Sequence, residues 1–263
     1  MSDEVVGRPR GYLATGRAMS FGEQADLYER VRPGYPEALA AALGARPGLR
    51  LLDVGCGTGK ASAAFRAAGC DVLGIDPDPR MAELGRERGL EVEVGRFEEW
   101  ETAGRRFDLV IAGQAWHWVE PRIGPTKASR LLERGGRLAP FWNYRHPAGP
   151  LQSRLEPLYA RLAPALLEHS PLLGTVDDIE ELNRYAEAIT LSGVFEVAEI
   201  LRFPWTTSYT TEEWAGLSRT QSDHRLLAPE ALEELLAAVG EELAHGGPWV
   251  VDYESAVVIA TRR

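Results

Sequence analysis

Three glycines at alternate positions are the most distinctive chemical feature of this 263-residue sequence. Gly55, Gly57 and Gly59 follow the apolar run 51–54 and precede an alanine-rich stretch that is typical of a helix. Glycine permits a tight turn and lets the backbone approach a ligand closely. The first turn of the following helix offers N–H groups and the positive end of the helix dipole. The loop can therefore bind a ligand through its backbone.

The spacing of these glycines separates three kinds of ligand-binding loop. A dinucleotide-binding fingerprint, G-x-G-x-x-G, requires glycine where this chain has Lys60. A phosphate-binding P-loop, G-x-x-x-x-G-K-S/T, requires glycine in place of Val54 and serine or threonine in place of Ala61. The pattern D/E-x-G-x-G-x-G matches at every position when it begins at Asp53. The third pattern therefore describes the loop best.

An acidic residue, Asp76, ends the next apolar run, 71–75, roughly 20 residues beyond the glycines. A carboxylate at this point can accept hydrogen bonds from both hydroxyl groups of a ribose. The same charge would repel a ribose that carries a 2′-phosphate. The alternative role of Asp76 is to cap the helix that follows it.

Seven short apolar runs predict strands, and helical patterns separate most of them. The predicted strands are 51–54, 71–75, 90–94, 108–112, 137–142, 195–204 and 250–261. The predicted helices are 21–32, 36–43, 61–68, 80–87, 128–132 and 229–243, and the fifth of these is expected to stop at Gly135-Gly136. Strands joined by helices form right-handed βαβ units, so the sequence predicts an α/β fold with a mostly parallel sheet.

The regular alternation lapses in the second half of the chain and suggests a division into parts. We expect a flexible arm over 1–20 and a ligand-binding domain built from 21–147 and 191–263. The segment 148–190 has helical patterns without a strand and predicts a helical cap, which residues 206–227 would join. A cap there would cover the carboxyl ends of the strands, where open α/β sheets bind ligands.

Composition and charge exclude several classes of protein. The hydrophobic fraction of 44% and the charged fraction of 26% are ordinary globular values, which argues against disorder. The net charge of −10 argues against nucleic acid as a partner. Apolar stretches of membrane-spanning length and an apolar signal region are absent, so we expect no membrane partner. Two cysteines without metal-ligand spacing predict a cytoplasmic protein with no bound metal.

The segment 53–59, with Asp76, resembles the first motifs of class I S-adenosylmethionine-dependent methyltransferases. The resemblance implies S-adenosyl-L-methionine as cofactor and S-adenosyl-L-homocysteine as product. It also implies a Rossmann-like, mostly parallel, seven-stranded sheet with helices on both faces and a helical cap insertion.

Three further segments resemble the same family. Residues 94–99 follow the third predicted strand, where such enzymes bind adenine, and 107–114 resemble the fourth-strand motif beside the sulfonium. Residues 131–138 resemble the Leu-x-Pro-Gly-Gly turn before the fifth strand, with Arg134 in place of proline.

Two segments suggest a narrower branch of the family. Residues 21–36 and 114–118 look like the small-molecule methyltransferases related to the trans-aconitate enzyme. The resemblance covers roughly 21–145, and beyond it only the architecture is similar. It implies transfer of a methyl group to an O, N or C atom of a small-molecule acceptor by a monomer or homodimer.

The resemblance implies a set of cofactor-binding residues on the arm, the glycine loop and the next three strand ends. Tyr28 and Arg32 would clamp the carboxylate of the cofactor, because arginine makes a two-pronged contact with such a group. Phe97 would lie against the adenine ring and Glu98 near its amino group. The full set is Tyr28, Arg32, Asp53, Gly55, Cys56, Gly57, Gly59, Asp76, Pro77, Phe97, Glu98 and Gln114.

His117 is the candidate catalytic residue, because neutral imidazole can take a proton near pH 7. A base is required only if the acceptor atom carries a proton of high pKa. The candidate substrate-binding residues are Trp116, Trp118, Trp142, Asn143 and Tyr144. Asn143 or Tyr144 would orient a substrate oxygen, and the tryptophans would wall an apolar pocket.

Each of these assignments has a structural alternative. The aromatic side chains and His117 can simply pack in the core, and Tyr28 and Arg32 can lie on a solvated helix face. For the whole protein, the alternatives are a catalytically silent cofactor-binding module and, against the glycine spacing, a nicotinamide-dependent oxidoreductase.

Overall fold

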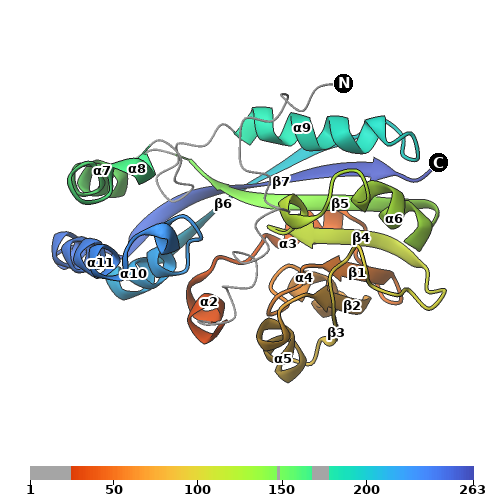
Figure 1. Ribbon diagram of the computed structural model, residues 1–263, viewed down its shortest axis with the longest axis horizontal. Helices are drawn as coiled ribbons and strands as arrows, with labels where there is room; N and C mark the ends of the chain where they lie inside the picture. Colours follow the sequence, from red (N-terminus) through yellow and green to blue (C-terminus); the bar gives the residue numbers. More distant parts are fainter. Residues whose placement is uncertain (1–24, 147–148, 168–177) are drawn as a thin grey trace.

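The computed structural model describes residues 25–146, 149–167 and 178–263 (Figure 1). The arm expected over 1–20 and the first part of the helix expected over 21–32 lie outside the described residues. No helix in the described ranges has the length and apolar character needed to cross a membrane.

A seven-stranded sheet forms the centre of the protein. In chain order its strands are β1 (Arg50–Val54), β2 (Asp71–Asp76), β3 (Glu91–Val94), β4 (Phe107–Gly113), β5 (Leu132–Arg145), β6 (Glu199–Tyr209) and β7 (Trp249–Thr261). The strand order is β3-β2-β1-β4-β5-β7-β6. β7 pairs antiparallel with β5 and β6, whereas the pairs among β1 to β5 are parallel. The predicted Rossmann-like, mostly parallel sheet is confirmed.

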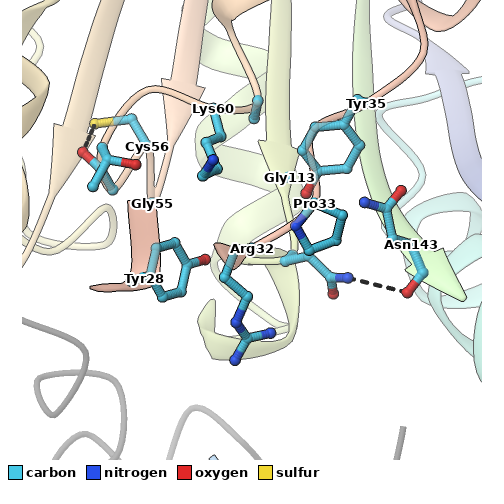
Figure 2. A pocket seen from close by; sticks show the side chains of 13 residues that line it. Tyr28, Arg32, Pro33, Tyr35, Gly55, Cys56, Lys60, Gly113 and Asn143 are labelled. Atoms are coloured by element: carbon cyan, nitrogen blue, oxygen red, sulfur yellow. Dashed lines mark hydrogen bonds between the residues drawn. The ribbon is translucent and has the colours of Figure 1, made fainter. Parts of the chain in front are cut away.

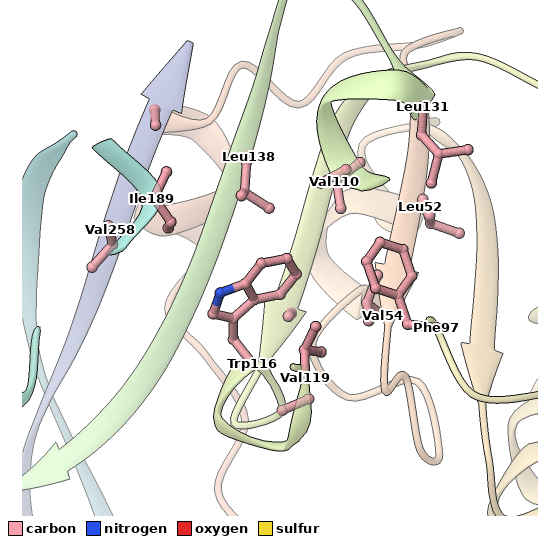
Figure 3. Close-up of a cluster of buried hydrophobic side chains, with 14 of the residues drawn as sticks. Leu52, Val54, Phe97, Val110, Trp116, Val119, Leu131, Leu138, Ile189 and Val258 are labelled. Atoms are coloured by element: carbon pink, nitrogen blue, oxygen red, sulfur yellow. The ribbon is translucent and has the colours of Figure 1, made fainter. Parts of the chain in front are cut away.

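Helices cover both faces of this sheet and make a three-layer core. On one face lie α3 (Glu37–Ala42), α4 (Ala63–Ala67) and α5 (Pro79–Glu87). On the other lie α6 (Gly124–Leu131) and α9 (Asp178–Leu191), which pack on the cluster around Leu138, Trp116 and Val258 (Figure 3). Successive strand residues alternate between the two layers, so each strand in the centre of the sheet is buried on both sides.

A second group of helices gathers at the carboxyl end of β5. It comprises α2 (Ala25–Val31), α7 (Pro150–Leu162), α8 (Pro164–Leu167), α10 (Thr211–Arg219) and α11 (Pro229–Leu243), with the short helix η5 (His224–Leu226), and we call it the helical cluster (Figure 1, left). Its core includes Tyr209, Trp249 and Tyr253 from the long strands β6 and β7. The extension of these strands past β1 to β4 therefore carries the cluster.

The segment expected to form a cap divides between these two places. α7 and α8 belong to the helical cluster, whereas α9 packs on the sheet through Leu182 and Ile189. Tyr185 of α9 stacks on Trp142 with 4.6 Å between ring centroids. Residues 206–209, expected near the cap, continue β6. The division into domains stays a prediction.

The prediction that a helix over 128–132 stops at Gly135-Gly136 was wrong. The helix ends at Leu131, and β5 begins at Leu132, whose partner is Phe107 of β4. The pairing then shifts, so that the next paired residues are Leu109 and Arg137. Pairing with β4 gives the backbone at Leu132 hydrogen-bond partners that local helix propensity could not reveal.

Candidate functional site

A pocket opens where β1, β4 and β5 end, beneath α2 (Figure 2). The empty space within it amounts to about 460 Å³, and this figure includes open solvent. Its lining residues are Tyr28, Arg32, Pro33, Tyr35, Gly55, Cys56, Gly57, Thr58, Lys60, Ala61, Gly113, Gln114 and Asn143. The lining contains two cationic side chains, and among the described residues it contains no acidic one, although the chain carries a net charge of −10.

The glycine loop forms one wall of the pocket. Gly55, Gly57 and Gly59 have φ values of 67°, 53° and 87°, a region that side chains other than glycine rarely adopt. The amides of Gly55 and Cys56 donate to the carbonyl oxygen of Ile75 at 2.8 and 3.1 Å, which ties the loop to the end of β2. A Cβ atom on Gly55 would lie 2.5 Å from that of Ala115, so this turn also needs glycine for close approach.

Asp76 lies at the end of β2, as expected, directly behind the glycine loop. Its carboxylate accepts hydrogen bonds from the amides of Gly57 at 2.8 Å and Asp78 at 2.9 Å. Burial raises the pKa of Asp76 to about 6, against these two bonds, which lower it. Pro77 is half-buried in the bend that leads into α5. Asp76 thus holds the glycine loop in shape, and the loop in turn holds its carboxylate.

Asp53 is a second buried carboxyl group in this region, on β1. The residue is 0% exposed, and neither carboxylate oxygen has a hydrogen-bond partner among the described residues. Burial raises the pKa of Asp53 to about 7, and the charge of Asp76 adds to the rise. The Ser62 hydroxyl opposes it, but this hydroxyl donates its hydrogen bond to the carbonyl of Gly59. Desolvation without a full set of donors favours the neutral acid.

Helix α2 closes the pocket from the side of the helical cluster. Its Glu29 accepts a hydrogen bond from the Thr58 hydroxyl and lies 3.5 Å from Nζ of Lys60 and 3.4 Å from Nε of Arg88. These contacts fasten α2 to the glycine loop and to the end of α5. Burial lowers the pKa of Lys60, while Glu29 opposes that change.

Tyr28 and Arg32 line the pocket from α2 and from the turn that follows it. The Arg32 guanidinium lies over the Tyr28 ring, 5.2 Å from its centroid. Nε and Nη2 of Arg32 donate to the hydroxyl and the carbonyl oxygen of Thr220, at 3.0 and 2.6 Å. Among the described residues, no carboxylate lies within 4 Å of this guanidinium. Arg32 therefore joins α2 to α10 and faces a pocket without a protein counter-ion.

Asn143 and Gln114 form the wall opposite the glycine loop. Gln114 has a φ of 55°, and its side-chain nitrogen donates to the backbone oxygen of Asn143 at 3.2 Å. The Asn143 amide nitrogen donates to the Gly34 carbonyl at 2.9 Å. The turn that bears Tyr35 is thereby fixed to β5.

Several predicted ligand-binding residues lie in the sheet core instead of the pocket lining. Phe97, Trp116 and Trp142 are at most 4% exposed and belong to the cluster under α6 and α9 (Figure 3). Tyr144 packs partly buried against the same cluster. Trp118 is half-buried. The structure does not bring these side chains to the described pocket, and their ligand roles stay predictions.

Glu98 is likewise used by the protein itself. Its carboxylate accepts a hydrogen bond from the amide of Glu120 at 2.8 Å and lies 3.8 Å from Arg96. These contacts tie the segment after β3 to the segment that follows η3 (Trp116–Trp118).

His117 lies on η3 and does not line the described pocket. Its Nδ1 accepts a hydrogen bond from Nε1 of Trp142 at 3.2 Å. An indole nitrogen only donates, so the neutral ring of His117 carries its proton on Nε2 in this arrangement. A role as base at Nδ1 would require release of this atom from Trp142.

The sequence analysis missed Tyr35, Thr58, Lys60 and Gly113 as pocket residues. In the sequence, Tyr35 lies only within the segment 21–36 that resembles the narrower branch, and Lys60 is a mismatch to the dinucleotide-binding fingerprint. The Tyr35 ring packs edge-on against Phe141, with 4.7 Å between centroids, and burial raises the pKa of its hydroxyl well above the ordinary value. Residues next to a recognised glycine loop are the signal that could have found Thr58 and Lys60.

Comparison with known proteins places this geometry in a structural class. Residues 52–139 match the sequence model of a family described as a methyltransferase domain. A proposed type II methyltransferase from Anaeromyxobacter dehalogenans is 22% identical, with a TM-score of 0.61 over 88% of this chain and 97% of that one. The chain has a methyltransferase fold.

Two further matches agree with the methyltransferase fold. Phosphoethanolamine N-methyltransferase 2 of Haemonchus contortus, solved with phosphomonomethylethanolamine and S-adenosylhomocysteine, has a TM-score of 0.55 at 18% identity, over 98% of this chain and 60% of that one. An uncharacterized methyltransferase of Mycobacterium tuberculosis is 37% identical over 130 residues, or 49% of this chain. The match spans 54% of that relative, so the chain covers about half the length of this curated protein.

Gly55 offers a test of the loop geometry in this methyltransferase fold. We expect Gly55→Ala to cost about 1–2 kcal/mol for the left-handed backbone and a further 1–3 kcal/mol for displacing Ala115. Gly104→Ala is the matched control, because its φ is 75° and a Cβ there meets nothing within 4 Å. The free energy of unfolding is measured in urea. Equal losses in the two variants would contradict the close approach at Gly55.

Asp53 makes stability depend on pH. Its pKa rises from about 4 in an unfolded chain to about 7, so the folded state binds the proton more tightly between these values. The free energy of unfolding should therefore fall as pH rises through this interval. We expect Asp53→Asn to gain about 1–3 kcal/mol relative to the parent between pH 5 and pH 8, measured in urea. The exposed Asp71→Asn is the control, and parallel curves for parent and Asp53→Asn would refute the assignment.

Proposed function

We propose that this protein is an S-adenosylmethionine-dependent methyltransferase that acts on an O, N or C atom of a small-molecule acceptor. The observation that carries the proposal is the glycine loop, held by Ile75 and Asp76 at the carboxyl edge of the sheet. This loop lies within the segment that matches the methyltransferase family model. The order of the seven strands places the pocket where α/β folds of this kind bind ligands.

The side chains present fit such a cofactor. Arg32, with Tyr28 beneath it, offers a guanidinium for a carboxylate group. Asp76 offers a carboxylate for ribose hydroxyls, and the open backbone of the glycine loop permits close contact. Asp53 provides a second acidic group on the same side of the sheet, and a positively charged ligand would favour its ionised form.

Methyl transfer of this kind requires no covalent bond between the protein and the reactants. When bound, S-adenosylmethionine would supply a methyl group on its sulfonium, and the sulfur would keep the bonding electrons when an acceptor atom takes that group. Positioning of the two reactants can account for much of the rate. In this proposal α2, the glycine loop and Asn143, which line the pocket, orient the two reactants. We further propose Asn143 as an acceptor-orienting residue.

A small acceptor suits the surroundings of the pocket. The pocket lies at the carboxyl edge of the sheet, and the helical cluster lies beside it. The net charge of −10 disfavours a nucleic-acid acceptor. We propose the branch related to trans-aconitate methyltransferase, because residues 21–36 and 114–118 resemble it, and we do not extend the acceptor of that enzyme to this protein.

Titration with S-adenosylmethionine by calorimetry, followed by detection of S-adenosylhomocysteine with a broad acceptor panel, tests the proposal. Binding and turnover support it. Binding without turnover on any acceptor would favour a silent cofactor-binding module, and absence of binding would refute the proposal.

Asp76 should contribute directly to cofactor affinity. We expect Asp76→Ala to weaken S-adenosylmethionine binding by about 1–3 kcal/mol, because hydrogen bonds to a charged group are lost. Calorimetry measures the change, and Asp71→Ala at the exposed start of the same strand is the control. Unchanged affinity would contradict the proposal that Asp76 binds the ribose hydroxyls of the cofactor.

His117 is a proposed catalytic residue whose donor geometry makes a distinct prediction. His117→Ala should lower turnover at least tenfold while cofactor affinity changes less than twofold, because the ring lies outside the described pocket lining. His146→Ala, at an exposed site near Glu254, is the control. Equal turnover in parent and His117→Ala would exclude His117 from the mechanism.

A further inference from the structure

A chain of hydrogen bonds crosses three strands and ends at the pocket. Nε1 of Trp205 on β6 donates to the Ser255 hydroxyl on β7 at 2.9 Å. The Ser255 hydroxyl donates to Oδ1 of Asn143 on β5 at 2.5 Å. The amide nitrogen of Asn143 donates to the carbonyl oxygen of Gly34 at 2.9 Å. Ser255, at the centre of this series of bonds, is 0% exposed, whereas the bond from Asn143 to Gly34 lies at the surface of the pocket.

The groups at the two ends of this series of hydrogen bonds fix which atom donates and which accepts in each bond. The indole nitrogen of Trp205 can only donate, and the backbone oxygen of Gly34 can only accept. If the Asn143 amide turned over, its oxygen would face the Gly34 oxygen across 2.9 Å, and two acceptors would repel each other. The Ser255 hydroxyl would then also lack its acceptor in a dry interior, which is costly. The amide therefore has one favourable orientation.

This orientation decides what Asn143 offers to a ligand. Its oxygen is engaged by Ser255 on the side of β7, and its nitrogen lies on the side of Tyr35 (Figure 2). The nitrogen carries two N–H groups, of which Gly34 takes one. The remaining N–H meets no acceptor among the described residues, and Asn143 lines the pocket. At this point of the wall Asn143 thus presents a donor.

We propose that Trp205 and Ser255 are positioning residues that hold Asn143 as a hydrogen-bond donor, so that the Asn143 side chain selects a ligand oxygen that accepts. This inference rests on the proposed function, in which such an oxygen is a carboxylate or carbonyl of either the methyl acceptor or the cofactor. A ligand that presents only N–H groups here is rejected, because it would leave the Asn143 donor unpaired in contact with another donor.

We call the series of hydrogen bonds from Trp205 through Ser255 and Asn143 to Gly34 the relay. Trp205 permits a conservative test of it. Its ring stacks on Tyr253, with centroids 4.9 Å apart and planes 19° apart, so Trp205→Phe removes the N–H and keeps an aromatic ring on this contact. Ser255→Ala removes the central hydroxyl. Trp100→Phe is the matched control, because its indole donates to Glu93 near β3, away from the relay.

The experiment follows the side-chain amide signals of Asn143 by NMR in protein labelled with ¹⁵N-asparagine. Three probes are titrated: S-adenosylhomocysteine, and then benzoate and benzylammonium, each with and without S-adenosylhomocysteine. We expect at least one carboxylate probe to shift both amide protons, and benzylammonium to leave them unchanged. Trp205→Phe and Ser255→Ala should weaken that carboxylate probe at least threefold, and Trp100→Phe should not.

The outcomes separate the inference from the function it rests on. A shift with S-adenosylhomocysteine assigns the oxygen to the cofactor, whereas a shift with benzoate on the loaded protein assigns it to the acceptor, and either supports the inference. The inference is overturned if S-adenosylhomocysteine binds but neither carboxylate moves the Asn143 signals, if benzylammonium moves them, or if both relay variants behave as the parent. Failure of S-adenosylhomocysteine to bind at all would instead refute the proposed function.

Discussion

The contact between the Asp76 carboxylate and the amide of Gly57 underlies the whole site. It joins the end of β2 to a glycine loop whose backbone would otherwise have few restraints, and the paired bonds from Gly55 and Cys56 to Ile75 complete the attachment. A buried carboxylate needs donors, and a left-handed loop needs anchors, so each satisfies the requirement of the other. These hydrogen bonds therefore hold the glycine loop, which forms one wall of the pocket, in its shape.

Helix α2 connects that loop to the rest of the molecule. Glu29 binds the loop and the end of α5, whereas Arg32 binds Thr220 in the helical cluster. The pocket is therefore bounded by parts of the chain that are far apart in sequence and that share one short helix. Within the part of the chain that the structure describes, the Asp53 oxygens have no hydrogen-bond partner and Arg32 has no carboxylate within 4 Å. Unsatisfied polar groups of this kind are expected where a bound ligand supplies the missing partners.

Most strands of the sheet could be predicted from the local sequence pattern. Apolar runs such as 71–75 and 108–112 fall inside β2 and β4, because a strand buried on both faces must be apolar throughout. The start of β5 at Leu132 and the bounds of β6 could not be predicted in this way. Pairing with a neighbouring strand decided them, and Pro204 is tolerated because β6 lies at the edge of the sheet.

The sequence by itself determined the glycine loop and the acidic residue at the end of β2, because both depend on residue type at fixed spacing along one chain. Only the tertiary structure decided which aromatic residues reach the pocket. Trp142 and Asn143 are neighbours in sequence, yet the first stacks on α9 and the second lines the pocket. Alternation along a strand sends them to opposite faces, and the helices that cover each face come from distant segments whose packing no local pattern encodes.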